Sequence, residues 1–188
     1  GRDIKQMFPD RAPVEASDVA LSVRDVSVEG QVRDASFDLR RGEVLGFAGI
    51  VGAGRTALME AIIGLRERTS GEIKRNGNTV SINSLQDAKK CRIAYLTKDR
   101  KGSGLLLNMD MRPNLTLLAL EKFGSVIIDR KAEEAALANA IEAFDIRAAD
   151  PKTKVGDFSG GNQQKLLLAK VMETDSEIVI IDEPTRGI

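Results

Sequence analysis

With 188 residues, the chain is long enough to fold as one domain around a substantial apolar core. Its 28 basic and 28 acidic residues give a formal net charge of zero, which disfavours a protein dedicated to binding nucleic acid. The chain has no histidine and one cysteine, Cys91, which excludes an internal disulfide and histidine acid–base chemistry. No apolar run approaches the length of about 18 residues that a membrane-spanning helix needs, so the sequence predicts no such helix.

The N-terminal part predicts a linker followed by an antiparallel β-layer. Residues 1–18 are polar and contain two prolines, which is typical of a linker. Residues 20–28 and 32–39 alternate well enough to predict two strands, with Gly30 in the turn between them. Residues 71–82, with Asn-Gly at the centre, predict a further hairpin.

A glycine-rich loop follows the first two strands, from Gly49 to Thr56. The apolar run 44–48 before it predicts a buried strand, and the helical spacing of Leu58, Ile62 and Leu65 predicts a helix after it. Strand, glycine loop and helix are the context of a phosphate-binding loop, in which backbone N–H groups and the helix dipole face an anion.

The loop departs from the usual phosphate-binding pattern at one position. Arg55 stands where a lysine normally reaches the phosphates, and its planar guanidinium is no compact ammonium. Thr56 is placed to offer its hydroxyl to Mg²⁺. Alone, the loop is equally compatible with nucleotide binding and with a strand-to-helix turn that holds no ligand.

The central part alternates helices with one strand. The pattern predicts a short helix at 85–90, a strand at 92–96, and helices at 114–123 and 129–144. The polar segment 97–104 between them is either a solvated charged loop or a switch loop near phosphates or a partner.

Two further motifs lie near the C-terminal end. Ser159, Gly160 and Gly161 precede an apolar helix, where they form either an anion site or an ordinary serine cap with two flexible glycines. The buried strand 178–181 ends in Asp182 and Glu183. Opposite a phosphate loop, Asp182 can hold Mg²⁺ through water, and Glu183 can orient or activate the attacking water. The alternative, a strand that simply ends in an acidic turn, is weaker because the other two motifs are present.

In this order and at these separations, the three motifs together resemble the nucleotide-binding domain of an ABC transporter. Residues 159–163 resemble its signature motif and 178–183 its Walker B segment. The resemblance implies an α/β P-loop NTPase of ABC type, with a mostly parallel core sheet, an N-terminal antiparallel β-layer and a helical subdomain. The ABC domain would occupy residues 19–188, with the helical subdomain at about 105–170, and would be truncated at its C-terminus.

A closer resemblance is to the second domain of the tandem ATPases of bacterial monosaccharide importers, of the ribose, galactose and arabinose kind. It is carried by the Gly-Ala-Gly-Arg-Thr loop, Asp-Arg-Lys at 99–101, and the segments 158–165 and 182–187. The partners it implies are the first ATP-binding domain of the same polypeptide, the transmembrane permease subunits and, indirectly, an extracytoplasmic sugar-binding protein. The implied location is cytoplasmic, on the inner face of the bacterial cell membrane.

The resemblance also implies the site residues, with ATP and Mg²⁺ as cofactors. Glu183 is the catalytic residue, and Thr56 and Asp182 are the metal ligands. The nucleotide-binding residues are Gly49, Gly52, Ala53, Gly54, Arg55 and Thr56 in the phosphate loop, and Ser159, Gly160, Gly161 and Gln163 in the signature motif. In a head-to-tail pair, this signature would complete the partner domain's site.

Three departures weaken catalysis by this chain alone. Lys98 stands where the family has Gln or Glu and cannot ligate Mg²⁺, Ala57 removes a second hydroxyl, and the switch histidine is absent. We therefore expect the isolated chain to be nearly inactive. The alternative is a non-hydrolysing nucleotide-binding or regulatory ABC module. A chromosome or DNA-repair ATPase of the same superfamily is disfavoured, because no sustained heptads indicate a coiled coil.

Overall fold

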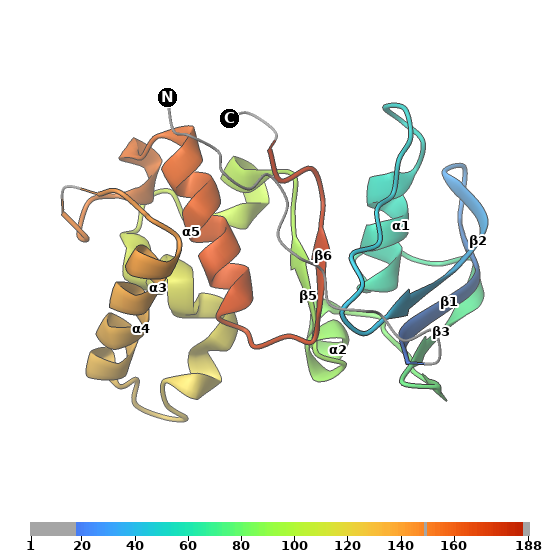
Figure 1. Ribbon diagram of the computed structural model, residues 1–188, viewed down its shortest axis with the longest axis horizontal. Coiled ribbons are helices and arrows are strands. Elements are labelled where there is room, and N and C mark those ends of the chain that lie inside the picture. The colour runs from blue at the N-terminus through green and yellow to red at the C-terminus, as the bar shows by residue number, and fades with distance from the viewer. Residues whose placement is uncertain (1–17, 149, 186–188) are drawn as a thin grey trace. The chain divides into compact units, whose positions relative to one another are not determined.

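The computed structural model describes residues 18–148 and 150–185, which fall into two compact units that divide between Ser84 and Leu85 (Figure 1). Residues 1–17 of the predicted linker lie outside the described residues. Among the helices that the structure describes, none has the length and apolar character needed to cross a bilayer.

The first unit contains the predicted antiparallel sheet. Its strands are β1 (Val19–Val28), β2 (Val32–Arg40), β3 (Ser70–Arg75) and β4 (Asn78–Thr79), in the spatial order β2-β1-β3-β4. All three pairings are antiparallel, which confirms both predicted hairpins.

A β-bulge explains how the central strand β1 keeps its apolar residues buried. Leu21 and Val23 are buried, and so are Val26 and Val28, although the spacing between the two pairs breaks the two-residue alternation. Asp25 absorbs the extra residue, because it has a φ of 51° and lies where the register with β2 shifts.

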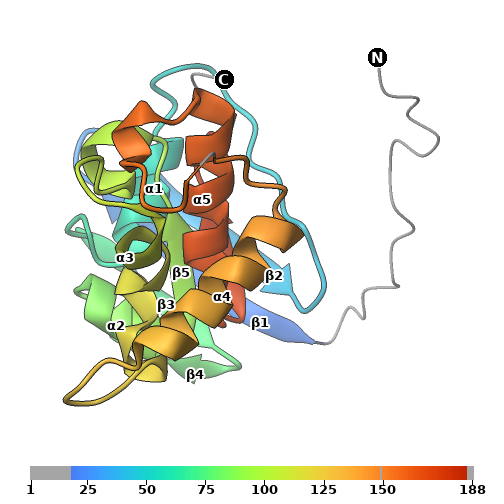
Figure 2. The same ribbon diagram turned by 90° about the vertical axis from the view of Figure 1, so that its left-hand side faces the viewer.

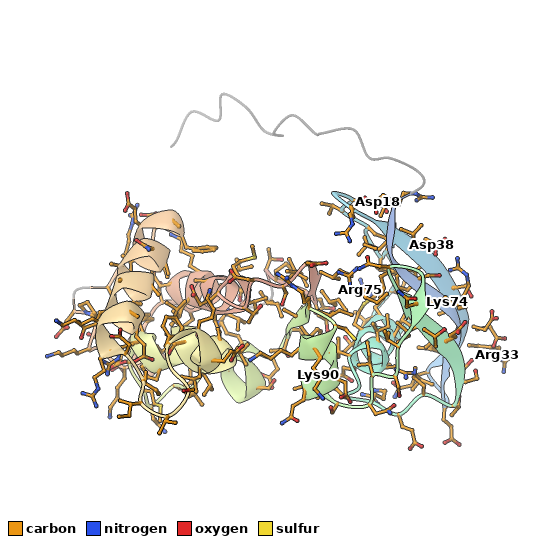
Figure 3. All side chains as sticks on the ribbon, turned by 90° about the horizontal axis from the view of Figure 1, so that it is seen from below. Asp18, Arg33, Asp38, Lys74, Arg75 and Lys90 are labelled. Atoms are coloured by element: carbon orange, nitrogen blue, oxygen red, sulfur yellow. The ribbon has the colours of Figure 1, made fainter. Side chains whose placement is uncertain are left out.

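Asp38, on the edge strand β2, and Lys74, on the inner strand β3, are two half-buried charged side chains of this sheet (Figure 3). NH2 of Arg24 donates to both carboxylate oxygens of Asp38, at 2.7 and 2.8 Å, and these hydrogen bonds hold the pKa of that carboxyl below its ordinary value. Charges on an edge strand discourage pairing with other chains.

The predicted strand at 44–48 is wrong. Residues 43–50 have no regular secondary structure, and Val44 is 92% exposed. A strand is held by hydrogen bonds to a neighbour, and no described strand pairs with this run, so its apolar character alone does not make it one. The helix after the loop, α1 (Arg55–Ile62), is confirmed, although it ends before Leu65, which is exposed.

The second unit combines a parallel strand pair with helices. Strands β5 (Ile93–Leu96) and β6 (Ile178–Ile181) pair in parallel, as the apolar run of β6 predicts. The helical elements are α2 (Leu85–Lys90), the π-turn η1 (Arg100–Gly104), α3 (Met111–Thr116), the 3₁₀ segment η2 (Leu117–Lys122), α4 (Arg130–Ala143), the 3₁₀ turn η3 (Val155–Asp157) and α5 (Gly160–Met172).

One core holds this unit together. It joins β5, α3, α4 and α5 through buried side chains that include Leu96, Leu115, Leu137 and Leu166. The predicted helix at 114–123 is wrong in its bounds. It begins three residues earlier, at Met111, because Asp110 caps it, and it gives way to η2, where Ala119 has non-helical backbone angles.

Candidate functional site

The phosphate loop is a tightly turned, exposed segment of the first unit. The backbone N–H of Ala53 donates to the carbonyl of Ile50 (3.1 Å), which closes a turn. Gly52 and Gly54 have φ values of 87° and 81°, the left-handed region that favours glycine. Gly54 is also crowded, because a Cβ built there would lie 2.3 Å from the carbonyl oxygen of Gln31.

Arg55 is the first residue of α1, and its side chain runs back over the loop. A Cβ placed on Gly49 would lie 3.7 Å from Cδ and 3.9 Å from Nε of Arg55. The guanidinium is therefore beside the loop that the sequence assigns to phosphate. Thr56, the next residue, is half-buried in the first turn of the same helix.

The signature segment forms the start of α5 in the second unit. Ser159 is the N-cap, and its hydroxyl oxygen accepts from the backbone N–H of Asn162 (3.4 Å). Ser159 is exposed and the two glycines are half-buried, so the first backbone N–H groups of a long helix border solvent. A helix start of this kind attracts anions through its free N–H groups and its dipole.

The next two side chains anchor this helix start instead of facing solvent. Asn162 makes two hydrogen bonds with the backbone of Arg147, accepting from its N–H (3.0 Å) and donating to its carbonyl (2.8 Å). Gln163 donates to the Val155 carbonyl (2.9 Å) and accepts from Arg100 Nε (3.1 Å). The sequence groups Gln163 with the residues that face the ligand. In the structure its side chain is buried, at 3% exposed, and its hydrogen bonds go to Val155 and Arg100 and not to the exposed edge at Ser159.

Asp182 and Glu183 directly follow the carboxyl end of β6. The backbone N–H of Asp182 donates to the Leu96 carbonyl (2.9 Å), which extends the parallel pairing with β5, and the carboxylate of Asp182 accepts from the Tyr95 hydroxyl (3.2 Å). Glu183 is exposed and has a φ of 45°, an uncommon conformation for a residue with a Cβ. Backbone strain of this sort is concentrated at functional sites.

The exposed helix start and the acidic pair lie at the same end of the second unit. Residues 173–177 make a short connection from α5 to β6, so the helix and the strand run in opposite directions (Figure 1). Figure 2 shows α5 beside β5, the strand that pairs in parallel with β6.

A magnesium ion fits the chemistry of the two predicted metal ligands. Asp182 offers a carboxylate oxygen and Thr56 a hydroxyl oxygen, and Mg²⁺ prefers hard oxygen ligands. Within the part of the chain that the structure describes, no group of three or more Cys, Asp or Glu side chains could hold a metal by itself. Each of the two side chains by itself offers the kind of oxygen that suits an ion which keeps several waters and binds phosphates.

Sequence reasoning missed two residues that support these motifs. The sequence interprets the segment around Arg100 either as a solvated charged loop or as a switch loop and gives Arg100 no role of its own, but its side chain is buried against the start of α5. Tyr95 was counted only as a strand residue, and it contacts the Asp182 carboxylate. Two-residue alternation in β5 could have placed Tyr95 on one face, but no sequence signal pairs it with Asp182.

Comparison with known proteins identifies the family. Residues 32–186 match the family model described as ABC transporter, and the chain belongs to that family. Ribose import ATP-binding protein RbsA of Clostridium perfringens (strain 13 / Type A) is 43% identical over 190 residues, which are 100% of this chain and 38% of that relative. Ribose import ATP-binding protein RbsA 1 of Burkholderia ambifaria is 41% identical over 192 residues, which are 100% of this chain and 37% of that relative. The chain thus spans well under half the length of these curated relatives.

Solved structures share the fold. An ATP-binding cassette in a dimeric post-hydrolysis state, bound to ADP and Pi, has a TM-score of 0.72 at 17% identity, covering 89% of this chain and 75% of that chain. CbiO1 from Clostridium perfringens, part of the ABC transporter complex cbiONQ, has a TM-score of 0.72 at 20% identity, covering 92% of this chain and 68% of that chain. At these identities the likeness shows the ABC cassette fold alone.

Proposed function

We propose that this chain is the second ATP-binding domain of a bacterial ABC importer for a monosaccharide. The observation that carries the proposal is the exposed start of α5, where Ser159 caps the helix and two glycines leave the N–H groups open to an anion. The relatives named for ribose import supply the substrate class.

The helix start acts as a lid on a nucleotide held by a partner domain. A phosphate oxygen would accept from the N–H groups at Gly160 and Gly161, and the Ser159 hydroxyl adds a donor beside them. The side chains of Asn162 and Gln163 keep this edge in place from behind. The donors would be aimed before the nucleotide arrives, so they lose little entropy when it binds.

The phosphate loop and the acidic pair would serve a second nucleotide. Backbone N–H groups at 52–56 bind its phosphates, with the Arg55 guanidinium beside them, and Thr56 and Asp182 hold Mg²⁺, which neutralises phosphate charge. Glu183 accepts a hydrogen bond from the attacking water and orients it. Because Arg55 replaces a compact ammonium, we propose that this second site binds ATP with slow turnover.

The partners proposed are those of a tandem importer. They are a first ATP-binding domain on the same polypeptide, the transmembrane permease subunits and, through these, an extracytoplasmic sugar-binding protein. The ABC domain proposed here begins at residue 19, with residues 1–18 as the linker to the first domain and a helical subdomain at about 105–170. It works on the cytoplasmic face of the membrane.

A second candidate is a regulatory ABC module that binds nucleotide without hydrolysis. Arg55 and Lys98 favour it, since neither reproduces the usual group at its position. Glu183, a carboxylate in a strained conformation after β6, favours the hydrolytic importer.

Two substitutions at Gly161 test the lid. A Cβ at Gly161 meets nothing within 4 Å, so both Gly161→Ala and Gly161→Asp should fold, and a helix start tolerates aspartate well. In the tandem protein, Gly161→Asp should lower ATP turnover by about tenfold or more relative to Gly161→Ala, since its carboxylate repels the phosphate. Equal turnover by the two variants would show that no nucleotide approaches this edge.

A further inference from the structure

Two cations are buried between η1 and α5. Arg100, at the start of η1, is 8% exposed, and Lys170, near the end of α5, is 6% exposed. Within the described residues, no ion pair joins either of them to a carboxylate. A buried cation with only neutral partners is costly to desolvate, so stability alone does not explain this arrangement.

Arg100 is bonded to the first turn of α5. Its Nε donates to Gln163 Oε1 (3.1 Å), and its NH1 lies 3.5 Å from Gln164 Oε1. Gln163 in turn donates to the Val155 carbonyl, so one glutamine joins three segments. A guanidinium presents its donors in a rigid plane, which fixes where the glutamine amide lies.

Lys170 fixes the other end of η1. Its ammonium donates to the carbonyl of Gly104 (2.8 Å), and Gly104 is the last residue of the turn. A Cβ at Gly104 would lie 3.2 and 3.3 Å from the two methyl groups of Leu167, so turn and helix are in close contact there. The turn is therefore attached to α5 at both of its ends.

The middle of η1 faces solvent. Asp99, Lys101, Gly102 and Ser103 are all exposed, while the Asp99 carboxylate accepts from the backbone N–H of Gly102 (2.9 Å) and stabilises the turn from within. Single π-helical turns are rare in proteins, and those that occur are frequently found at functional sites.

We infer that Arg100 is a positioning residue for the anion-binding edge at Ser159–Gly161. The inference rests on the proposed function of the edge. Arg100 itself touches no nucleotide. Through Gln163 it sets the orientation of the first turn of α5, and with it the donors that face the phosphate.

The test compares Arg100→Met with Lys101→Met. The two variants lose the same charge from adjacent residues of one turn, but only Arg100 is buried and bonded to α5. In this chain, hydrogen exchange of the amides at 162–165 should speed up by about tenfold in Arg100→Met and stay unchanged in Lys101→Met. The amides of β1 and β3 serve as internal references.

The second measurement is ATP turnover by the tandem protein. Arg100→Met should lower kcat by about tenfold with KM for ATP unchanged, because the partner's loop still binds the nucleotide while the lid is misplaced. A general loss of folding would also lower the apparent kcat, because less protein is active, but it would in addition speed up exchange at the reference amides of β1 and β3.

Gln163→Leu keeps the test open if Arg100→Met does not fold. It removes the acceptor from the other side and should reproduce the same changes, and the double variant should lose no more than either single one. Local exchange and kcat equal to Lys101→Met in both single variants would overturn the inference. A wild-type tandem protein without ATP turnover would overturn the proposed function instead, while the exchange measurement would still decide whether Arg100 holds the helix start.

Discussion

The hydroxyl of Tyr95 donates a hydrogen bond of 3.2 Å to Oδ2 of Asp182, across the carboxyl ends of two parallel strands. Asp182 is buried at 7% exposed, so its carboxylate depends on hydrogen-bond donors of the protein in place of bulk water. The contact fixes one oxygen of the group that we propose as a magnesium ligand. A group that hydrogen-bonds to a metal-ligating side chain and orients it often changes the affinity of the site for the metal.

Removing this hydroxyl should weaken the carboxylate's support without disturbing the core. Tyr95→Phe is expected to lower the free energy of unfolding by about 1 kcal/mol, the usual net worth of such a bond, and to weaken Mn²⁺-dependent nucleotide binding. Denaturant unfolding followed by circular dichroism measures the first effect, and electron paramagnetic resonance of Mn²⁺ the second. Ser125→Ala, which removes an exposed hydroxyl, is the control; the same small change in both variants would contradict the role given to Tyr95.

Tyr95 also offers a direct optical signal. It is the sole tyrosine and the chain has no tryptophan, so intrinsic fluorescence excited above the phenylalanine range comes from Tyr95 alone. Asp182→Asn removes the charged acceptor and should raise this emission, because hydrogen bonding to a carboxylate quenches tyrosine. Emission that is identical in Asp182→Asn and the wild type would show that the contact is not formed in solution.

The caps of two helices should separate stability from function. Ser159→Ala removes a long hydrogen bond of 3.4 Å and should cost less than about 1 kcal/mol of unfolding free energy. Asp129→Ala removes two bonds, of 2.9 and 3.2 Å, from the start of α4 and should cost about 1 kcal/mol or more. Turnover by the tandem protein should fall only in Ser159→Ala. A larger loss of turnover in Asp129→Ala would mean that activity follows stability, not the lid.

Two glycines of the phosphate loop should differ in their tolerance of alanine. Both have positive φ, but Gly52 has open space around its Cβ position, whereas Gly54 would place a Cβ 2.3 Å from the Gln31 carbonyl oxygen. Gly52→Ala should cost about 1–2 kcal/mol from the left-handed backbone alone, and Gly54→Ala clearly more. Urea unfolding of the two variants makes the comparison, and equal losses of unfolding free energy would contradict the close approach of Gln31, in the turn between β1 and β2, to the loop.

Lys170 should make stability depend on pH in the alkaline range. Burial lowers the pKa of its ammonium, so the unfolded chain, with a lysine pKa of about 10.4, binds more protons than the folded chain just below that pH. The unfolding free energy of the wild type, minus that of Lys170→Met, should therefore rise with pH between the folded pKa and about pH 10.4. Lys154→Met, at an exposed lysine, is the matched control variant. A difference that stays flat or falls would contradict the burial of a charged Lys170.

Local sequence signals predicted most of this fold. Asn76-Gly77 located its hairpin, and the serine before Gly160 located the start of α5, because turn and cap chemistry act within a few residues. The run at 44–48 failed, since apolar character does not tell whether a neighbouring strand is available to pair with it.

Of the site, the sequence predicted only the residues that belong to local motifs. Ser159 and Asp182 could be found because each lies where an element starts or ends. The roles of Arg100 and Tyr95 depend on partners 63 and 87 residues away, and no local pattern carries that information. Gln163 was assigned by motif position, and burial turned its side chain inward.

The most direct test of the central claim is calorimetric binding of ATP·Mg²⁺ to this chain. Arg55→Ala removes the guanidinium beside the loop, and Arg33→Ala removes an exposed guanidinium of the same unit as a matched control (Figure 3). The proposed ATP-binding function predicts saturable binding that Arg55→Ala weakens by about tenfold or more and Arg33→Ala leaves unchanged. No binding by a folded wild-type chain, or equal binding by both variants, would contradict it.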